Sequence, residues 1–308
     1  MRIVHTLERR DDARGLVLAI GFFDGVHRGH RETLRTLLRQ RRPGERAGVL
    51  TFENHPAAFL RPEAVPPLIT TQEERVTLLA GTGIDSVYLV PFGADIAALS
   101  AEEFIRRVLI EALDVRAVVI GENFRFGSGR AGDARLAREL LEPTGRAVVV
   151  TPSLTEAGER VSSTRIRAAL RNGDVEAADA LLGRPYMLRG RVVLGEGRGH
   201  ELGFPTANLA TPPQKMLPMD GVYSVVARYD GRDRAGLVSI GSKPTFGGEE
   251  RVVEAWLRDF RETIYGEELS LRDFRFLREQ RAFATADDLL AQMHDDATRV
   301  RFPSFLPT

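Results

Sequence analysis

The stretch Gly21-Phe-Phe-Asp-Gly-Val-His27-Arg-Gly-His30 follows an apolar run at residues 14–20 and leads into an amphipathic segment at residues 30–42. This order of strand, glycine-rich turn and helix is typical of an open α/β sheet, in which ligands bind beyond the carboxyl ends of the strands. The glycines let the backbone approach a phosphate chain, and the start of the following helix favours anions. The stretch therefore predicts a nucleotide-binding α/β domain with phosphate contacts at Gly21 and Gly25.

Two imidazoles, His27 and His30, lie three residues apart at the predicted start of the helix, where both can face one ligand. We interpret them as part of a triphosphate-binding loop. The alternative is that one imidazole caps the helix and the other packs in the core. A zinc site is disfavoured, because it needs a third ligand and no other residues have the spacing of metal ligands. Asp24 fits either a turn-forming role or a magnesium ligand.

Short apolar runs alternate with amphipathic segments as far as about residue 150, which predicts βα units. Because the runs lack strict alternation, they favour a parallel sheet that is buried on both faces. Thr71 with Glu74 and Ser100 with Glu103 have the capping-box spacing and mark two helix starts. Further helices are expected near 101–113 and 133–141. The five apolar runs cover residues 14–21, 47–52, 86–92, 116–121 and 146–151.

After Gly183 the pattern changes to closely spaced alternating runs separated by Gly, Pro and Asp turns, which predicts an antiparallel β-barrel. A last helix over about 285–301 carries apolar residues at helical spacing and is expected to cover the barrel. We place the domain boundary near residues 183–186, which gives domains of 1–183 and 184–308. The alternating runs cover residues 187–195, 221–231, 234–241, 251–260 and 268–277.

Composition excludes several classes of protein. The chain has 308 residues, enough for two domains, and its 43 basic residues equal its 43 acidic ones, which disfavours nucleic-acid partners. It contains no cysteine, so it has neither disulfides nor thiolate metal sites, and a cytoplasmic location is the default. The N-terminus lacks an apolar signal region and no stretch is long enough to cross a bilayer, so no membrane partner is expected. Self-association stays open.

The decapeptide resembles the His-x-Gly-His motif of nucleotidylyl transferases, and with its Phe-Asp-Gly-Val lead-in it resembles the bacterial bifunctional riboflavin kinase/FAD synthetase family. The likeness continues in order through Thr51-Phe-Glu-Asn-His-Pro56, Gly121-Glu-Asn-Phe-Arg-Phe-Gly127 and Ser162-Ser-Thr-Arg-Ile-Arg167. It implies a Rossmann-like nucleotidylyl transferase parallel sheet, followed by an antiparallel six-stranded riboflavin kinase β-barrel with a terminal helix.

For the N-terminal domain, the resemblance implies that His27, His30 and Arg165 act on the departing pyrophosphate. Ser162 to Arg165 combine helix-capping hydroxyls with a cation, although an ordinary capped helix explains that segment equally well. Flavin contacts are expected at His55, Pro56, Phe124 and Arg125, and Phe124 could instead be plain core. ATP contacts are expected at Gly21, Phe23, Gly25, Asn123, Arg160, Ser163 and Thr164.

The barrel carries a second glycine cluster, from Gly195 to Asn208, but no Walker-type phosphate loop occurs in the chain. Clustered glycines expose backbone N–H groups, and a hydroxyl and an amide at its end offer oxygens to a hard cation. A flexible hairpin turn is the alternative. The end of the cluster resembles the riboflavin kinase motif Gly-Phe-Pro-Thr-Ala-Asn, which implies that Thr206 and Asn208 bind ATP and Mg²⁺, with further ATP contacts at Gly197 and Gly199.

Glu254 is our candidate for the general base on the riboflavin 5′-hydroxyl, since phosphoryl transfer needs positioning, a metal ion and a carboxylate that orients the nucleophile. An exposed strand glutamate is the alternative. The chain departs from the family pattern at Asn54, where Pro is usual, at Ser239, where Asn is usual, and at Trp256, where His is usual.

Taken together, the residues and the resemblance predict an enzyme that phosphorylates riboflavin to FMN and adenylylates FMN to FAD, with ATP as donor in both steps and Mg²⁺ as cofactor. Two other interpretations stay open. One is a nucleotidylyl transferase for another phosphorylated acceptor, with an accessory barrel. The other is a non-catalytic flavin-binding regulator that retains the motifs.

Overall fold

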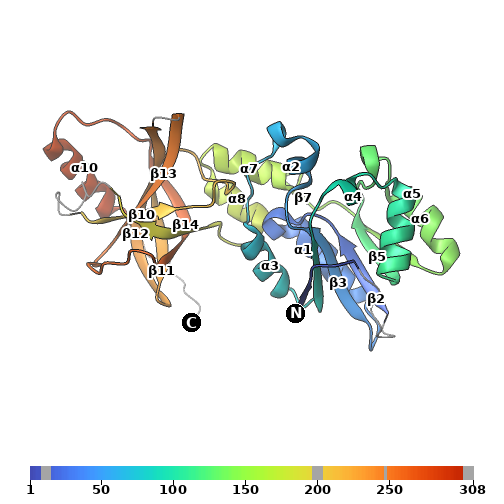
Figure 1. Cartoon of the computed structure of the whole chain (residues 1–308). Helices are drawn as coiled ribbons and strands as arrows, with labels where there is room; N and C mark the ends of the chain where they lie inside the picture. Colours follow the sequence, from blue (N-terminus) through green and yellow to red (C-terminus); the bar gives the residue numbers. More distant parts are fainter. Residues whose placement is uncertain (8–14, 196–203, 246–247, 301–308) are drawn as a thin grey trace. The chain divides into compact units, whose positions relative to one another are not determined.

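The computed structural model describes residues 1–7, 15–195, 204–245 and 248–300, and side chains are described for all of these except residues 243–245 and 248–250. By its internal contacts the chain forms two compact units, Met1–Ser163 and Thr164–Thr308 (Figure 1). Within the described ranges, no helix has the length and apolar character needed to span a membrane.

The first unit is built on a six-stranded sheet in which every neighbouring pair is parallel, as the uniform apolar runs predicted. Its spatial order is β1-β4-β3-β2-β5-β6, so the direction of winding reverses between β2 and β5. In such sheets the crevice at that reversal is where ligands bind. The strands are β1 (Arg2–Val4), β2 (Leu16–Ile20), β3 (Arg46–Phe52), β4 (Ser86–Val90), β5 (Val115–Gly121) and β6 (Ala147–Thr151).

Helical segments cover both faces of this sheet, which is why its strands are apolar on both sides. One core cluster joins the sheet to α1 (Arg28–Gln40) and α3 (Gln72–Ala80), and the other joins it to η3 (Phe104–Ala112) and α6 (Ala134–Leu141). The unit also contains the short segments η1 (Asp24–Val26), α2 (Pro56–Leu60), η2 (Pro62–Ala64), α4 (Ala94–Ala97), α5 (Ala101–Glu103), η4 (Ser128–Arg130), η5 (Glu142–Thr144), β7 (Thr155–Glu156) and β8 (Glu159–Arg160).

Both predicted capping boxes are present. The hydroxyls of Thr71 and Ser100 each accept the backbone N–H three residues on, and the glutamate at that position reaches back to the cap N–H. The helix that Ser100 starts differs from expectation in its interior, because α5 passes into π-helical turns over η3. Its last turn closes with a bond from Leu113 N–H to the carbonyl of Val108, five residues back. Capping residues mark the start of a helix in the sequence, whereas a π-helical turn has no comparable sequence pattern.

The second unit contains a closed barrel with the strand order β10-β13-β12-β11-β14-β9, and all of its pairs are antiparallel. This confirms the expected six-stranded barrel. The strands are β9 (Met187–Val193), β10 (Thr206–Ala210), β11 (Gly221–Tyr229), β12 (Arg232–Thr245), β13 (Gly248–Leu257) and β14 (Glu268–Arg278). Helices α7 (Ser163–Arg171) and α8 (Val175–Leu182) precede the barrel, and α8 contacts β14. The predicted boundary at residue 183 stays a prediction.

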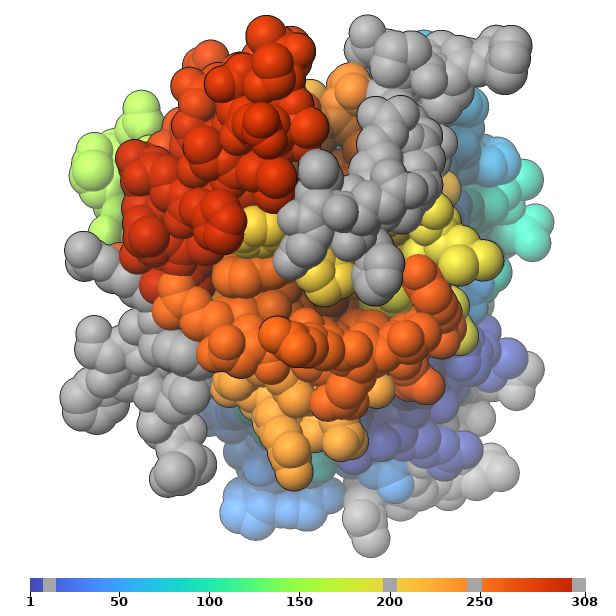
Figure 2. All heavy atoms as spheres, turned by 90° about the vertical axis from the view of Figure 1, so that its left-hand side faces the viewer, coloured from blue at the N-terminus to red at the C-terminus, as the bar shows by residue number. Residues whose placement is uncertain are grey.

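Helix α10 (Ala286–Thr298) lies within the range expected for the last helix, is capped by Thr285, and packs on the outer face of the barrel (Figure 2). Val222 and Leu237 of the barrel join Ala297 of the helix in one apolar cluster. Beside it, Asp296 is only 1% exposed and accepts bonds of 2.8 to 3.1 Å from the guanidinium of Arg278 on β14. An ion pair and a hydrocarbon contact thus fasten the helix to the barrel.

We predict that Asp296→Ala lowers the free energy of unfolding of the barrel unit by about 3 kcal/mol, because it leaves a mostly buried guanidinium unpaired. Urea unfolding monitored by circular dichroism measures the loss. The matched control is Asp295→Ala on the same helix, whose ion pair with Arg299 is half exposed. Its effect is expected to stay below about 1 kcal/mol. Equal losses in the two variants would contradict the anchoring role of Asp296.

Asp179 on α8 gives the fold a second testable property. Burial raises the pKa of its carboxyl to about 7, and the charge of Asp273 acts in the same direction, although the carboxylate accepts the Tyr186 N–H at 2.5 Å. The folded pKa lies above the unfolded value of 3.8, so the protonated folded state is favoured at low pH. This contribution to stability is complete below about pH 4 and is lost as pH rises through about 7.

We therefore predict that Asp179→Asn, which keeps an acceptor for the Tyr186 N–H but cannot ionise, stabilises the protein relative to wild type at pH 8 and not at pH 4. The expected gain is roughly 2 kcal/mol, allowing for solvent access to the half-buried carboxylate. Urea midpoints at the two pH values measure it. Asp174→Asn, at the exposed N-cap of the same helix, is the control. An Asp179→Asn effect that is independent of pH would refute the prediction.

Candidate functional site

The loop from Gly21 to His30 follows β2, at the reversal point of the sheet, as the sequence predicted. It is tightly wound, with positive φ angles of 58° at Phe23, 79° at Gly25 and 39° at Val26. Such angles are costly for Phe and Val, and they cluster at functional sites because the surrounding structure has to hold them. The amide of Gly21 donates to the Leu50 carbonyl at 3.1 Å. The loop is therefore a strained segment tied to the neighbouring strand β3.

Asp24 anchors this loop to the segment at residues 69–70. Its carboxylate is 3% exposed and accepts bonds from the N–H groups of Ile69 and Thr70 and from the Thr70 hydroxyl, at 3.0 to 3.2 Å. That hydroxyl in turn accepts the N–H of Gly25 at 2.9 Å. Of the two roles that the sequence left open for Asp24, this bonding favours the structural one. Thr70 had no recognisable signal in the sequence.

The two imidazoles lie together at the start of α1. Their ring centroids are 3.6 Å apart with planes 15° apart, and Nδ1 of His27 accepts the backbone N–H of His30 at 3.3 Å. A Cβ on Gly29 would lie 3.2 Å from the His27 ring, so this glycine makes room for the stack. His27 thus combines the predicted ligand position with the capping role that was its alternative.

The bonding also indicates which ring nitrogen of His27 carries a proton. Because Nδ1 of His27 accepts the hydrogen bond from the His30 backbone N–H, the tautomer that fits this bond carries its ring proton on Nε2. Burial lowers the pKa of His30 well below 6.5, and the nearby His27 lowers it further. Nδ1 of His30 is buried and has no hydrogen-bond partner among the described residues. The neutral form of His30 is therefore favoured.

The second predicted phosphate segment begins beside this loop. The hydroxyl of Ser163, the first residue of α7, donates to the Asp24 carbonyl at 3.0 Å. Thr164 and Arg165 follow it in the first turn of the helix, and Arg160 is exposed on the short strand β8. Since Ser163 contacts the loop directly, the structure brings the start of this segment to the predicted site.

His55 and Pro56 also reach the site region. The His55 ring lies edge-on to Phe22 at 4.7 Å, while its Nδ1 caps α2 by accepting the Ala57 N–H at 3.1 Å. Asn54, where the family usually has Pro, bonds the backbone of Phe92 through both its amide nitrogen and its oxygen, at 3.0 and 2.8 Å. The departure at position 54 therefore replaces a rigid residue with one held by two hydrogen bonds.

Arg75 is a residue that the sequence interpretation missed. It is fully buried on α3, its guanidinium lies 4.1 Å over the Phe22 ring, and it donates to the Phe52 carbonyl at 2.5 Å. Burial lowers its pKa to about 10, opposed by the charge of Asp24. It thus joins the ends of two segments that carry predicted site residues. An arginine in a helix normally indicates a solvated face, so this position could not be recognised from the residue pattern.

The remaining N-terminal candidates follow β5. Asn123 is exposed and its amide donates to the Ser153 hydroxyl at 3.0 Å. Phe124 stacks on Phe126 at 5.7 Å and packs against the core, so the core interpretation of Phe124 holds at least in part. Arg125 is exposed, and its guanidinium donates to the neighbouring carbonyl of Phe124 at 2.9 Å. These residues lie at the carboxyl edge of the sheet, where ligands bind in this architecture.

In the barrel, Glu254 lies in the middle of a polar row that crosses three strands. It pairs with Asn208 of β10 on one side and with Ser239 of β12 on the other. Directly paired residues of antiparallel strands point to the same face. A Cβ on Gly195 would lie 1.9 Å from the Asn208 amide nitrogen, so the glycine leaves space for that side chain. The structure thus brings together Asn208, Glu254 and Ser239, the last of which stands where the family usually has Asn.

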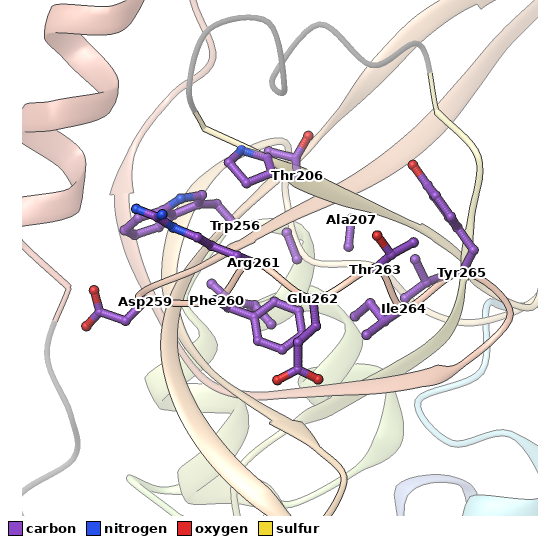
Figure 3. Close-up of a pocket in the computed structure, with 14 residues that line it drawn as sticks. Thr206, Ala207, Trp256, Asp259, Phe260, Arg261, Glu262, Thr263, Ile264 and Tyr265 are labelled. Atoms are coloured by element: carbon purple, nitrogen blue, oxygen red, sulfur yellow. The ribbon is translucent and has the colours of Figure 1, made fainter.

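A pocket of about 580 Å³ lies beside this row (Figure 3). Thr206 and Trp256 pair across β10 and β13 and both line it, and the segment from Asp259 to Tyr265 forms another wall. Its size is in the range of small-molecule sites. Trp256, where the family usually has His, also contacts the Phe204 ring at 5.6 Å. The predicted ATP contacts Gly197 and Gly199 lie outside the described residues.

Comparison with known proteins covers both units. The family model described as FAD synthetase matches residues 9–165, and the one described as riboflavin kinase matches residues 182–302. A crystal structure from Streptococcus pneumoniae, described as that of a macrolide-efflux protein, matches with a TM-score of 0.87 at 31% identity, covering 97% of this chain and 98% of that one.

Curated relatives extend over nearly the whole chain. A protein of Escherichia coli K12, described as a bifunctional riboflavin kinase/FMN adenylyltransferase, is 36% identical over 98% of this chain and 96% of its own length. A protein of Bacillus subtilis with the same description is 35% identical over 95% of this chain and 93% of its own length. The two consecutive family models and these full-length relatives show that the chain belongs to the bifunctional riboflavin kinase/FMN adenylyltransferase family.

Proposed function

We propose that this chain makes FAD from riboflavin in two ATP-dependent steps. The barrel unit transfers the γ-phosphoryl group of ATP to riboflavin and yields FMN and ADP. The N-terminal unit transfers the adenylyl group of ATP to FMN and yields FAD and pyrophosphate. The observation that carries this proposal is that each unit holds its own polar site, the imidazole pair after β2 and the Asn208–Glu254 pair in the barrel. We keep residue 183 as the boundary between the two activities.

In the adenylylation step, an FMN phosphate oxygen attacks the α-phosphorus of ATP, and the bond from that phosphorus to the bridging oxygen of pyrophosphate breaks. Such a reaction needs positioning and charge stabilisation rather than a covalent enzyme intermediate. The cap bond uses Nδ1 of His27 and orients the ring, and we assign the other ring nitrogen, Nε2, to donate to the phosphate chain of ATP. We assign His30 and Arg165 to bind the same phosphate chain of ATP. We assign His55 and Pro56 to contact the flavin.

In the kinase step, the riboflavin 5′-oxygen attacks the γ-phosphorus of ATP while its proton passes to a base and ADP departs. We assign Glu254 as that base. Its neighbour Asn208 is one strand away on the same face, which suits a carboxylate that orients the hydroxyl while the amide binds phosphate or its cation. The pocket lined by Thr206 and Trp256 adjoins this pair and is of a size to admit a substrate.

Magnesium fits the residues on β10. Thr206 and Asn208 are two residues apart, so they share a face, and both offer oxygen ligands. Within the described part of the chain no three His, Cys, Asp or Glu side chains gather as a metal site. A cation here would accordingly be held by one or two protein oxygens together with substrate phosphates, as is usual for Mg²⁺. When bound, it would neutralise phosphate charge.

We further propose a cytoplasmic setting for this pair of activities and small molecules as the partners. A chain without cysteine needs no oxidising compartment to fold. Self-association is left open.

We predict that Glu254→Gln lowers riboflavin phosphorylation by at least about 100-fold, because the amide cannot accept the hydroxyl proton, while FMN adenylylation stays within twofold of wild type. Separating flavins chromatographically after incubation with ATP and magnesium, from riboflavin or from FMN, measures both rates. Glu268→Gln, an exposed residue at the start of β14, is the control. Undiminished phosphorylation in Glu254→Gln would remove Glu254 from the role of base.

For the N-terminal site the converse is expected. Combining His27→Ala with His30→Ala should reduce FAD formation by at least about 100-fold and let FMN accumulate from riboflavin, because donors to the phosphate chain are lost. Since His27 caps α1, the single variant His27→Asn is the companion, because Asn retains a capping side chain but lacks Nε2–H. The control is His5→Ala, at an exposed imidazole. If either set of changes abolished both reactions in a folded protein, the two-site assignment would be wrong.

A further inference from the structure

The side chain of Gln280 extends to β12, the strand that pairs with the strand of Glu254. Gln280 lies two residues beyond the end of β14, and its Nε2 donates to the hydroxyl oxygen of Ser239 at 2.8 Å. Ser239 on β12 is the direct cross-strand partner of Glu254. A residue far along the sequence thus contacts the immediate neighbour of the proposed base.

Gly241 makes this contact sterically feasible. A Cβ at position 241 would lie 2.2 Å from the Gln280 amide oxygen and 2.4 Å from its amide carbon, distances that real side chains do not tolerate. Gly241 and Ser239 are two residues apart on one strand, so their α-carbons present the same face. The Gln280 amide therefore lies flat over the glycine with its nitrogen directed at the serine. The absence of a side chain at 241 and the presence of a hydroxyl at 239 together define its place.

The bond from Gln280 decides what the Ser239 hydroxyl can do. Its oxygen accepts from the amide, so its proton remains to be donated elsewhere. Ser239 has two cross-strand neighbours, Val222 on β11 and Glu254 on β13. Val222 is a buried hydrocarbon side chain and accepts nothing. Cβ atoms of directly paired residues lie about 5 Å apart. The two described side chains are not bonded to each other, and rotation of either about its Cα–Cβ bond can bring the hydroxyl to the Glu254 carboxylate.

We propose that Ser239 and Gln280 are positioning residues for the kinase reaction, in which Ser239 donates a hydrogen bond to the Glu254 carboxylate and Gln280 holds the serine in that orientation. The inference rests on the proposed role of Glu254. A carboxylate with one oxygen held by the serine turns its other oxygen to the riboflavin hydroxyl in a fixed direction. Loss of either residue then misorients the base without removing it.

Four variants test the chain of contacts: Ser239→Ala, Gln280→Ala, the two combined, and Ser239→Thr. Ser239→Ala and Gln280→Ala should each lower kcat of riboflavin phosphorylation about tenfold, the scale of one hydrogen bond to a charged group, with KM for ATP and riboflavin within twofold. The double variant should be no worse than Ser239→Ala, because Gln280 acts through the serine. Ser239→Thr retains the hydroxyl and should keep most of the rate.

Gly241→Ala provides an independent perturbation. The added methyl group collides with the end of a flexible glutamine side chain, so the fold can yield by moving Gln280 aside, and the variant should reproduce Gln280→Ala. Adenylylation of FMN by the same preparations reports whether the chain is folded and should not change. Glu279→Ala, at the exposed neighbour of Gln280, is the matched control.

The outcomes separate this inference from the proposed function. If wild type does not phosphorylate riboflavin, the proposed function fails. If Glu254→Gln retains full kinase activity, the role of Glu254 as base fails, and the positioning role of Ser239 and Gln280 fails with it. If Glu254→Gln is inactive while Ser239→Ala and Gln280→Ala keep full kcat, the positioning role is refuted and the function stands. Additive losses in the double variant, or a Ser239→Thr as impaired as Ser239→Ala, would equally overturn the proposed route through the hydroxyl.

Discussion

The buried carboxylate of Asp24 holds the conformation on which the N-terminal site depends. Left-handed backbone at Phe23 and Val26 costs about 1 to 3 kcal/mol for each residue, and a free loop would relax. The bonds from Asp24 to the 69–70 segment, and from Thr70 back to Gly25, close a ring of interactions around the strained residues. Because α1 begins directly after this ring, the position of both imidazoles follows from it. The two imidazoles are therefore positioned by a buried carboxylate, that of Asp24.

In the barrel, closure of the sheet holds the site residues in place. A closed sheet has no free edge, so each strand is fixed in register by two neighbours, and a shift of one residue would turn every side chain to the other face. The pairing of Glu254 with both Asn208 and Ser239 is one consequence of that register. The alternate residues of β13, Val253 and Ala255, are almost fully buried. The apolar interior thus holds the polar row on the outer face, and neither could move without the other.

The sequence predicted those features that leave a local chemical trace. The capping residues Thr71 and Ser100 mark the starts of two helices, and the change from uniform to alternating apolar runs separates the parallel sheet from the barrel. Edge strand β1 was missed, because three residues beside a charged segment give no pattern. Arg75 and Gln280 were missed for a different reason. Arginine and glutamine are residue types that usually face solvent. Only the tertiary structure brings Arg75 to Phe22 and Gln280 to Ser239.

The positions at which the chain departs from the family pattern show how such changes are accommodated. Asn54 gains two bonds to the backbone of Phe92. Trp256 gains an aromatic contact with Phe204, and Ser239 accepts the amide of Gln280. In each case the new side chain is held by a residue distant from it in the sequence, so the local motif alone does not reveal how the side chain is oriented. At Ser239 the support comes from the end of another strand, because the amide of Gln280 lies against Gly241. Site geometry in this fold is therefore a property of motif residues together with the supports that the barrel and the sheet bring to them.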